Sequence, residues 1–221
     1  KFEAEKTESL MDYIKIGTDD RIYAIAELLR RGVEMAVIAA EKRIERFFLD
    51  KMKKIVDMEK ELKQCSGDKA ILYQAKKMGF SDKAIAWLWN KKETDIFKMR
   101  KDAHIFPVYK MIDTCASEFE SYVPYFYSTY EIENESVIED RKKIIVLGSG
   151  PIRIGQGVEF DYSTVHAVKT IKEAGFEAII INNNPETVST DYTTSDKLYF
   201  EPLCVEDCLN VIELEKPDGI I

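Results

Sequence analysis

Residues 142–175, KKIIVLGSGPIRIGQGVEFDYSTVHAVKTIKEAG, contain the clearest structural pattern in the chain. The apolar run that ends at Gly148 is typical of a buried strand, and residues 163–174 form a helix pattern that Gly175 closes. A second buried-strand pattern follows at 178–181. A strand, a helix and a strand in this order predict parallel strands joined by a right-handed crossover.

The same alternation continues, with a short strand expected at 197–200, a helix at 205–215 and the start of another strand at 219–221. Six of the ten glycines and four of the six prolines lie beyond residue 140, which indicates a change of domain. We therefore expect residues 142–221 to form an incomplete, Rossmann-like α/β domain with a parallel sheet. Because the chain starts without methionine and stops inside a strand pattern, we expect an excerpt of a larger protein.

The first part of the chain, residues 1–138, has a helical pattern, so the predicted fold class is mixed: an all-α domain followed by α/β. Thr18 or Asp19 can cap a helix that ends near Gly32. A longer helix follows, and its apolar residues are expected to make one buried stripe: Ile44, Phe47, Phe48, Met52, Ile55, Val56 and Leu62. The charged residues 131–141 are expected to link the two domains.

Residues 69–101 resemble a helix-turn-helix DNA reader in outline. One helix pattern ends at Gly79, Ser81 can cap the next, and the stretch holds nine basic against three acidic residues. Such helix pairs are also common packing units, and such basic stretches are usually solvated helix faces. The whole chain has a net charge of −8, which argues against nucleic acid as a partner.

The composition, 45% hydrophobic and 33% charged, is typical of a globular chain, and its aliphatic runs are too short to span a membrane. The four cysteines are scattered, so we expect free thiols and a cytoplasmic location. Cys204 and Cys208 have ligand-like spacing, but no further Cys or His lies near them in sequence, so we expect no metal site. Neither His104 nor His166 adjoins a nucleophile motif, and we expect no complete active site.

Two loops qualify as ligand-binding loops, because ligands of parallel sheets bind where the strands end: residues 148–161 and 182–191. A dinucleotide fingerprint would need glycine where Arg153 stands, and no Gly-Lys-Ser/Thr of a P-loop follows the glycines. Glu159 and Glu186 leave neighbouring strands and can face a common polar space, where Arg153 could hold an anion or pair with one of them. Alternatively, these residues merely tie down a long loop.

Three segments together resemble the large chain of glutamine-dependent carbamoyl phosphate synthetase. They are VLGSGPIRIGQGVEFDYSTVH at 146–166, NNNPETVSTDYTTSDKLYFEP at 182–202 and VYKMIDTCASEFESYVPYFYSTYE at 108–131. The first two are similar to the pre-ATP-grasp domain of the half that phosphorylates carbamate. The third is similar to the end of that family's helical oligomerisation domain. Ile152 departs from the family, which usually has asparagine there.

The resemblance implies an ATP-dependent carbon–nitrogen ligase that makes carbamoyl phosphate from bicarbonate, glutamine-derived ammonia and two ATP, for arginine or pyrimidine biosynthesis. It implies that Gly157, Glu159 and Glu186 line the passage through which carbamate reaches the second synthetase site, with Arg153 in the same loop. Glycine, which has no side chain, would keep the passage wide, and carboxylates would give a polar wall that hydrogen-bonds without acting as a nucleophile.

The resemblance also sets expectations for cofactors and partners. ATP and Mg²⁺ (or Mn²⁺) belong to the parent enzyme, whose ATP-grasp domains lie outside these residues, so the fragment should bind neither and be inactive alone. Its partners would be the small glutaminase subunit and other large chains, and the fragment should self-associate. The alternative is a stand-alone nucleotide-binding Rossmann-like module with a helical interaction domain.

Overall fold

The structure, a computed structural model, describes residues 2–42, 44–113, 115, 116, 118, 119, 122–150 and 157–221. The chain divides into two compact units, Lys1–Ile96 and Phe97–Ile221. The first is helical and the second is built on a mostly parallel sheet, which confirms the predicted mixed fold class and its order.

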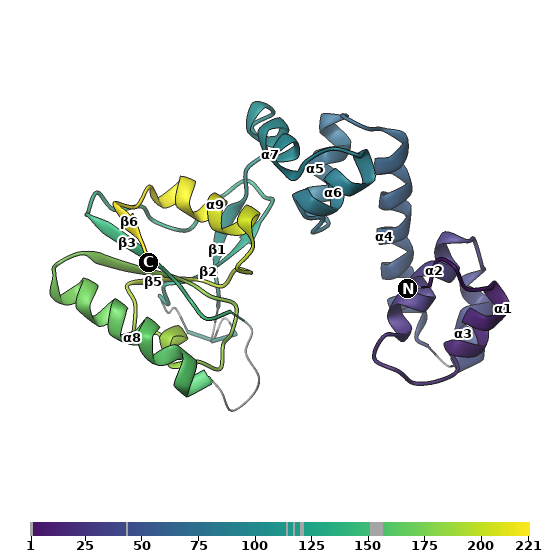
Figure 1. Cartoon of the computed structure of the whole chain (residues 1–221), viewed down its shortest axis with the longest axis horizontal. Helices are drawn as coiled ribbons and strands as arrows, with labels where there is room; N and C mark the ends of the chain where they lie inside the picture. The colour runs from purple at the N-terminus through teal and green to yellow at the C-terminus, as the bar shows by residue number, and fades with distance from the viewer. Residues whose placement is uncertain (1, 43, 114, 117, 120–121, 151–156) are drawn as a thin grey trace. The chain divides into compact units, whose positions relative to one another are not determined.

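The helical unit contains short helices around one long helix. In order they are α1 (Thr7–Tyr13), α2 (Arg21–Arg30), α3 (Met35–Lys42), α4 (Arg46–Gln64), α5 (Lys69–Lys77) and α6 (Asp82–Trp89), and α7 (Glu93–Asp102) begins here. The 19-residue α4 packs against α2, α3, α5 and α6 (Figure 1). At the junction with α6, the buried Trp89 donates its indole N–H to the carbonyl of Leu62 at 2.7 Å.

Local sequence determines the starts of α5 and α6, but the expected cap of α2 by Thr18 or Asp19 is wrong, because its N-cap residue is Asp20. The side chain of Asp68 accepts from the amides of Ala70 and Ile71. Ser81 caps α6 through the amide of Ala84, which confirms the cap predicted from the sequence. Gly79, expected to close the preceding helix, has a φ of +87°, a conformation that glycine adopts without strain.

The expected single buried stripe on α4 is wrong in part. Val56 and Leu62 are buried, but Phe47 is 62% exposed, Phe48 59% and Ile55 46%. Consecutive helical residues point about 100° apart, so apolar residues this numerous cover more than the one face that neighbouring helices bury. An apolar surface therefore remains on α4, which we call the α4 aromatic face and define by Phe47, Phe48 and Ile55.

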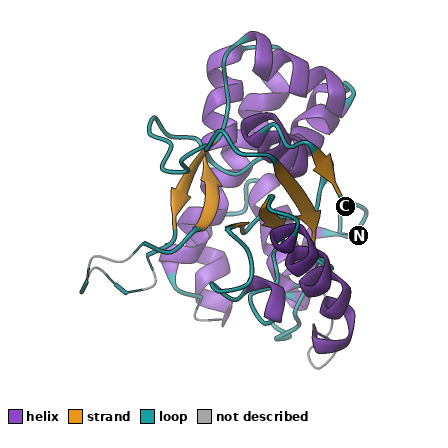
Figure 2. Ribbon diagram, turned by 90° about the vertical axis from the view of Figure 1, so that its left-hand side faces the viewer, coloured by secondary structure: helices purple, strands orange, loops and turns teal. Residues whose placement is uncertain are grey.

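The second unit is a six-stranded sheet in the order β1-β2-β5-β4-β3-β6, and all strands of the described chain lie in it (Figure 2). The strands are β1 (Val108–Met111), β2 (Tyr125–Thr129), β3 (Lys143–Leu147), β4 (Glu177–Ile181), β5 (Lys197–Tyr199) and β6 (Gly219–Ile220). Strands β2 to β6 pair in parallel, with Lys143 opposite Glu177 and Leu147 opposite Ile181 between β3 and β4. β1 pairs antiparallel with β2 at the edge.

Helices cover both faces of this sheet, α8 (Gly157–Glu173) on one and α9 (Val205–Glu215) on the other (Figure 1). Because side chains alternate along a strand, Ile145, Ile179 and Tyr199 pack with the α9 side, whereas Val146 and Ile180 pack with the α8 side. These elements agree with the expected strands and helices, although α8 begins at Gly157 rather than at residue 163.

The expectation that the helical part continues to residue 138 is wrong for β1 and β2. These strands belong to the sheet unit, and Tyr125 and Phe126 of β2 stand opposite Leu198 and Tyr199 of β5. Their short stretches have only weak apolar alternation, and the partner that makes them strands lies about 70 residues downstream. A local pattern cannot reveal such a pairing.

A buried ion network closes the amino end of the sheet. Glu215 of α9 lies 3.1 Å from the ammonium of Lys143 and 3.0 Å from that of Lys197. Glu177 lies 3.6 and 3.4 Å from the same two ammonium groups, and Tyr199 donates its hydroxyl to Glu215. All four charged side chains are nearly inaccessible, and two carboxylates balance two ammonium groups.

Candidate functional site

The site predicted from the sequence lies at the opposite edge of the sheet, where the parallel strands end. The loop after β3 begins with Gly148, and a Cβ on this residue would lie 2.5 Å from Cγ of Asn182, the first residue after β4. Gly150 has a φ of +70° and donates its amide to Oδ1 of Asn182 at 3.2 Å. The same oxygen accepts from the amide of Asn183 at 2.9 Å. One buried carboxamide therefore shapes the start of both loops.

The far end of the first loop is fixed as well. Asp161, on α8, is 1% exposed, and its Oδ2 accepts from the backbone amide of Ser189 in the second loop. Ser189 belongs to the short 3₁₀ turn η1 (Val188–Thr190), against which α8 packs. The two candidate loops are thus hydrogen-bonded to each other at both ends of the described part of the first loop.

The second loop is a compact, internally bonded turn. Glu186 donates its amide to Oδ1 of Asn184 at 3.0 Å, and Thr187 donates its hydroxyl to the carbonyl of Asn184 at 3.1 Å. The hydroxyl of Thr190 bonds the carbonyl of Thr187 at 2.7 Å, and Tyr125 of β2 donates its hydroxyl to the carbonyl of Thr190. Main-chain groups here are held by side chains of the loop itself and of the sheet, which favours one conformation.

The four predicted site residues have different outcomes. Glu186 is exposed at the carboxyl edge of the sheet, in the turn just described. Gly157 is the first residue of α8, and Glu159 lies in its first turn with a side chain outside the described part of the structure. Arg153 also lies outside the described residues. The backbone thus brings Gly157 and Glu186 to the same edge of the sheet, while the roles of all four residues stay predictions.

A carboxyl group with a perturbed pKa lies further along this edge. Glu201, just after β5, is 4% exposed and accepts from both the amide and the hydroxyl of Ser128 on β2. Burial raises the pKa of Glu201 to about 7, and the carboxylates of Asp207 and Glu206 add to the rise, while the bonds from Ser128 oppose it. This geometry ties β2 to the segment after β5 and so helps hold the antiparallel pair of β1 and β2 on the sheet.

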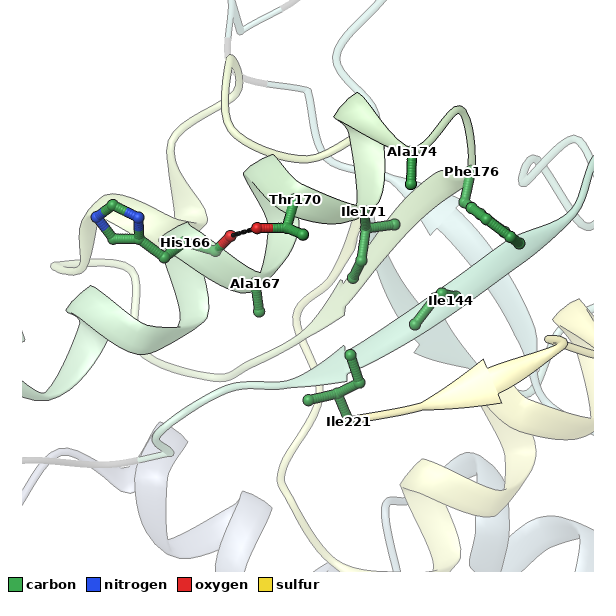
Figure 3. A pocket seen from close by; sticks show the side chains of 8 residues that line it. All are labelled: Ile144, His166, Ala167, Thr170, Ile171, Ala174, Phe176 and Ile221. Carbon is green, nitrogen blue, oxygen red and sulfur yellow. Dashed lines mark hydrogen bonds between the residues drawn. The ribbon is translucent and has the colours of Figure 1, made fainter.

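An apolar hollow of about 440 Å³ lies beside α8, between that helix, β3 and the chain end (Figure 3). None of the eight described residues that line it is Asp, Glu, Lys or Arg, and Figure 3 shows His166 with its ring turned away from Ile144 and Ile221. Such walls offer little to a phosphate or a carboxylate, so the polar loops are the better candidate site.

The other sequence predictions concern metal, thiols and membranes. Among the residues described here, no group of three His, Cys, Asp or Glu is placed to hold a metal ion. The four cysteines are free thiols, and burial, with a bond to Asp207, raises the pKa of Cys204 to about 11, which makes it a poor nucleophile. Within the described part of the chain, no helix has the length and apolarity to cross a bilayer.

The basic stretch at 69–101 is less basic at its surface than in its sequence. Lys76 is buried, lies 3.2 Å from the buried Asp82 and donates to the carbonyl of Phe80. Arg100 is also fully buried, 3.6 Å from Glu206. Two of the nine cations are therefore structural, which favours the helix pair as a packing unit.

Sequence reasoning missed Asn182 and Asp161 as residues that organise the site. Both are polar and both lie within the two loops, but their contacts join residues 28 and 32 positions apart. The available signal was the residue directly after each of the two buried strands, Gly148 after β3 and Asn182 after β4. Glycine at such a position indicates that another side chain approaches the backbone closely.

Two protein-family models match the chain, and each covers most of one unit. Residues 140–221 match the family model of the carbamoyl phosphate synthase preATP-grasp domain. Residues 1–104 match that of the carbamoyl-phosphate synthetase large chain, oligomerisation domain. The two matches follow one another along the chain and leave residues 105–139 between them, the region that contains β1 and β2.

Proposed function

Because the chain belongs to the large-chain family of carbamoyl phosphate synthase, we propose that it supplies two parts of that enzyme. The helical unit serves as a scaffold for subunit assembly, and the carboxyl edge of the sheet forms a section of the passage for carbamate. The observation that carries this proposal is the pair of consecutive family matches, one on each unit. The parent is then a ligase that makes carbamoyl phosphate from bicarbonate, glutamine-derived ammonia and two ATP.

The geometry of the two loops supports a role as a wall. Gly157 begins α8 without a side chain, Glu186 is exposed, and the loop that carries Glu186 is fixed by its own hydrogen bonds and by Asp161. A polar wall held by hydrogen bonds suits a passage that must guide an unstable anion without reacting with it, and glycine at residue 157 adds no side chain to that wall. Glu159 and Arg153 complete this wall in the proposal.

The test is a bulky side chain at residue 157. In the parent enzyme with its glutaminase subunit, Gly157→Phe should lower the carbamoyl phosphate formed per ATP hydrolysed at least tenfold, while bicarbonate-dependent ATP hydrolysis continues. Ser163→Phe, an exposed position on the same helix, is the matched control and should leave the ratio unchanged. An unchanged ratio in Gly157→Phe would remove the passage from the proposal.

Self-association is the second part of the proposal, and the α4 aromatic face supports it. Phe47 and Phe48 are more than half exposed and stack edge to face at 5.5 Å, with the ammonium of Lys51 5.1 Å from the Phe47 ring. Contiguous exposed aromatic residues are typical of protein interfaces. Light scattering of the 221-residue chain over a concentration series should show a dimer or larger species. Phe47→Ser with Phe48→Ser should shift it to monomer; a monomer already in the unmodified chain would contradict this part.

ATP and Mg²⁺ or Mn²⁺ are proposed to act in the parent outside these residues, in the cytoplasm. The loop after β3 lacks the lysine of a P-loop, and the fragment alone should give no heat with ATP or NAD in calorimetry. Binding of either nucleotide in the micromolar range would favour the rival function, a stand-alone nucleotide-binding module.

A further inference from the structure

The two loops at the carboxyl edge are connected by hydrogen bonds that run in opposite directions. Asn182, at the start of the second loop, accepts from the amide of Gly150 in the first. Asp161, at the end of the first loop, accepts from the amide of Ser189 in the second. In each case a side chain of one loop satisfies a main-chain donor of the other.

Both side chains are almost fully buried, and each has one polar atom that makes no hydrogen bond within the described part of the chain. Asn182 is 0% exposed and Asp161 1%. Within the described part of the chain, Nδ2 of Asn182 and Oδ1 of Asp161 have no hydrogen-bond partner. Burying a polar atom without a partner is unfavourable, so apolar residues of similar size would serve packing better. Their polarity is explained by what they hold.

The surroundings are built to fit this arrangement. A Cβ at residue 148 would overlap the side chain of Asn182, with Cγ at 2.5 Å and Nδ2 at 2.7 Å. Gly150 has a positive φ, which points its amide into the Asn182 carboxamide without strain. The glycines of the first loop therefore accommodate the side chain that holds it.

We propose that Asn182 and Asp161 are positioning residues that hold the two loops as one wall and fix the start of α8 relative to Glu186. Asp161 lies one helical turn after Gly157, and Ser189 lies three residues after Glu186, so their bond joins the helix that begins at Gly157 to the loop that carries Glu186. We call the two hydrogen bonds, from Gly150 to Asn182 and from Ser189 to Asp161, the loop clamp. The purpose of the clamp rests on the proposed passage, but the clamp itself is a property of the 221-residue chain.

The clamp is tested first in that chain by amide hydrogen exchange. Asp161→Val removes the acceptor, and the Ser189 amide should exchange 10- to 100-fold faster, as expected for loss of a bond to a charged group. Asp161→Asn keeps an acceptor oxygen and should stay within fivefold of the unmodified chain. The Ile180 amide of β4 serves as the control for an intact sheet. Unchanged exchange at Ser189 in Asp161→Val would overturn the clamp.

Asn182→Val provides the second, independent variant, read at the Gly150 amide with the same expected acceleration, and it decides if Asp161→Val does not fold. In the parent enzyme, Asp161→Val should lower the carbamoyl phosphate formed per ATP at least threefold, with Asp161→Asn restoring it. Faster exchange with an unchanged ratio, in an enzyme that Gly157→Phe does uncouple, would overturn the positioning role. If Gly157→Phe does not uncouple the enzyme, the passage itself fails, and the exchange data still decide on the clamp.

Discussion

The buried ion network at the amino end of the sheet makes a sharp prediction for Glu215→Gln. Glu215 is shared by two ammonium groups at 3.1 and 3.0 Å and accepts from the hydroxyl of Tyr199. Replacing its carboxylate with an amide leaves Lys143 and Lys197 with one carboxylate between them, that of Glu177. A buried positive charge is then uncompensated.

Breaking a buried ion pair from one side lowers the free energy of unfolding by about 3–5 kcal/mol, because the remaining charge stays out of water. Glu213 gives a matched control two residues earlier on α9. It lies 2.5 Å from Lys101, but the two side chains are 37% and 44% exposed. An exposed pair contributes about 0–1 kcal/mol, so Glu213→Gln should have a small effect.

Urea unfolding followed by far-ultraviolet circular dichroism measures the difference. With a slope of about 2–3 kcal/mol per molar urea, Glu215→Gln should lower the midpoint of the sheet unit by roughly 1–2.5 M. Both tryptophans, Trp87 and Trp89, lie in the helical unit, so their fluorescence gives a reference transition in the same sample. Equal midpoints for Glu215→Gln and Glu213→Gln would show that the buried network contributes no more to stability than the exposed pair.

Three further predictions follow from buried groups. Glu201 has a pKa of about 7 when folded and a lower pKa when unfolded, so its contribution to the free energy of unfolding falls by at most about 3 kcal/mol as pH rises from about 4.5 to 7. Glu201→Gln should remove this pH dependence of the free energy of unfolding. An unchanged pH dependence in Glu201→Gln would contradict the assignment to Glu201. Trp89→Phe should cost about 2 kcal/mol through lost packing and a lost hydrogen bond, whereas Trp87→Phe, 72% exposed, should change the unfolding midpoint little; similar midpoints would contradict this. Gly148→Ala should destabilise the chain by about 1–3 kcal/mol in thermal unfolding, because its Cβ meets Asn182, and an unchanged Tm would show that the loop adapts.

The α/β alternation could be predicted because each buried strand and each helix after residue 142 carries its own local signal. β4 is buried at every position, and Gly175 ends the helix before it. The strands β1 and β2 could not be predicted in this way, since their pairing with each other and with β5 depends on residues far away in sequence. The sequence therefore placed β1 and β2 in the helical domain, although they are strands of the sheet unit.

The helical unit shows a second limit. Periodicity identifies the apolar residues of α4, but which of them become buried depends on where α2, α3, α5 and α6 pack. The exposure of Phe47 and Phe48 follows from the tertiary packing of these helices. The same holds at the site: the loops could be predicted from the strand ends, but not the bond from Asp161 to Ser189, which exists only once the loops are folded.

The most direct test of the proposed passage follows the nitrogen of ¹⁵N-amide-labelled glutamine through the parent enzyme. With an open passage, most of the labelled nitrogen should appear in carbamoyl phosphate. In Gly157→Phe, most of it should appear as free ammonium, because carbamate held back at the wall decomposes, while glutamine hydrolysis continues. Label that still enters carbamoyl phosphate in full would contradict the claim that this edge of the sheet forms the wall of the passage.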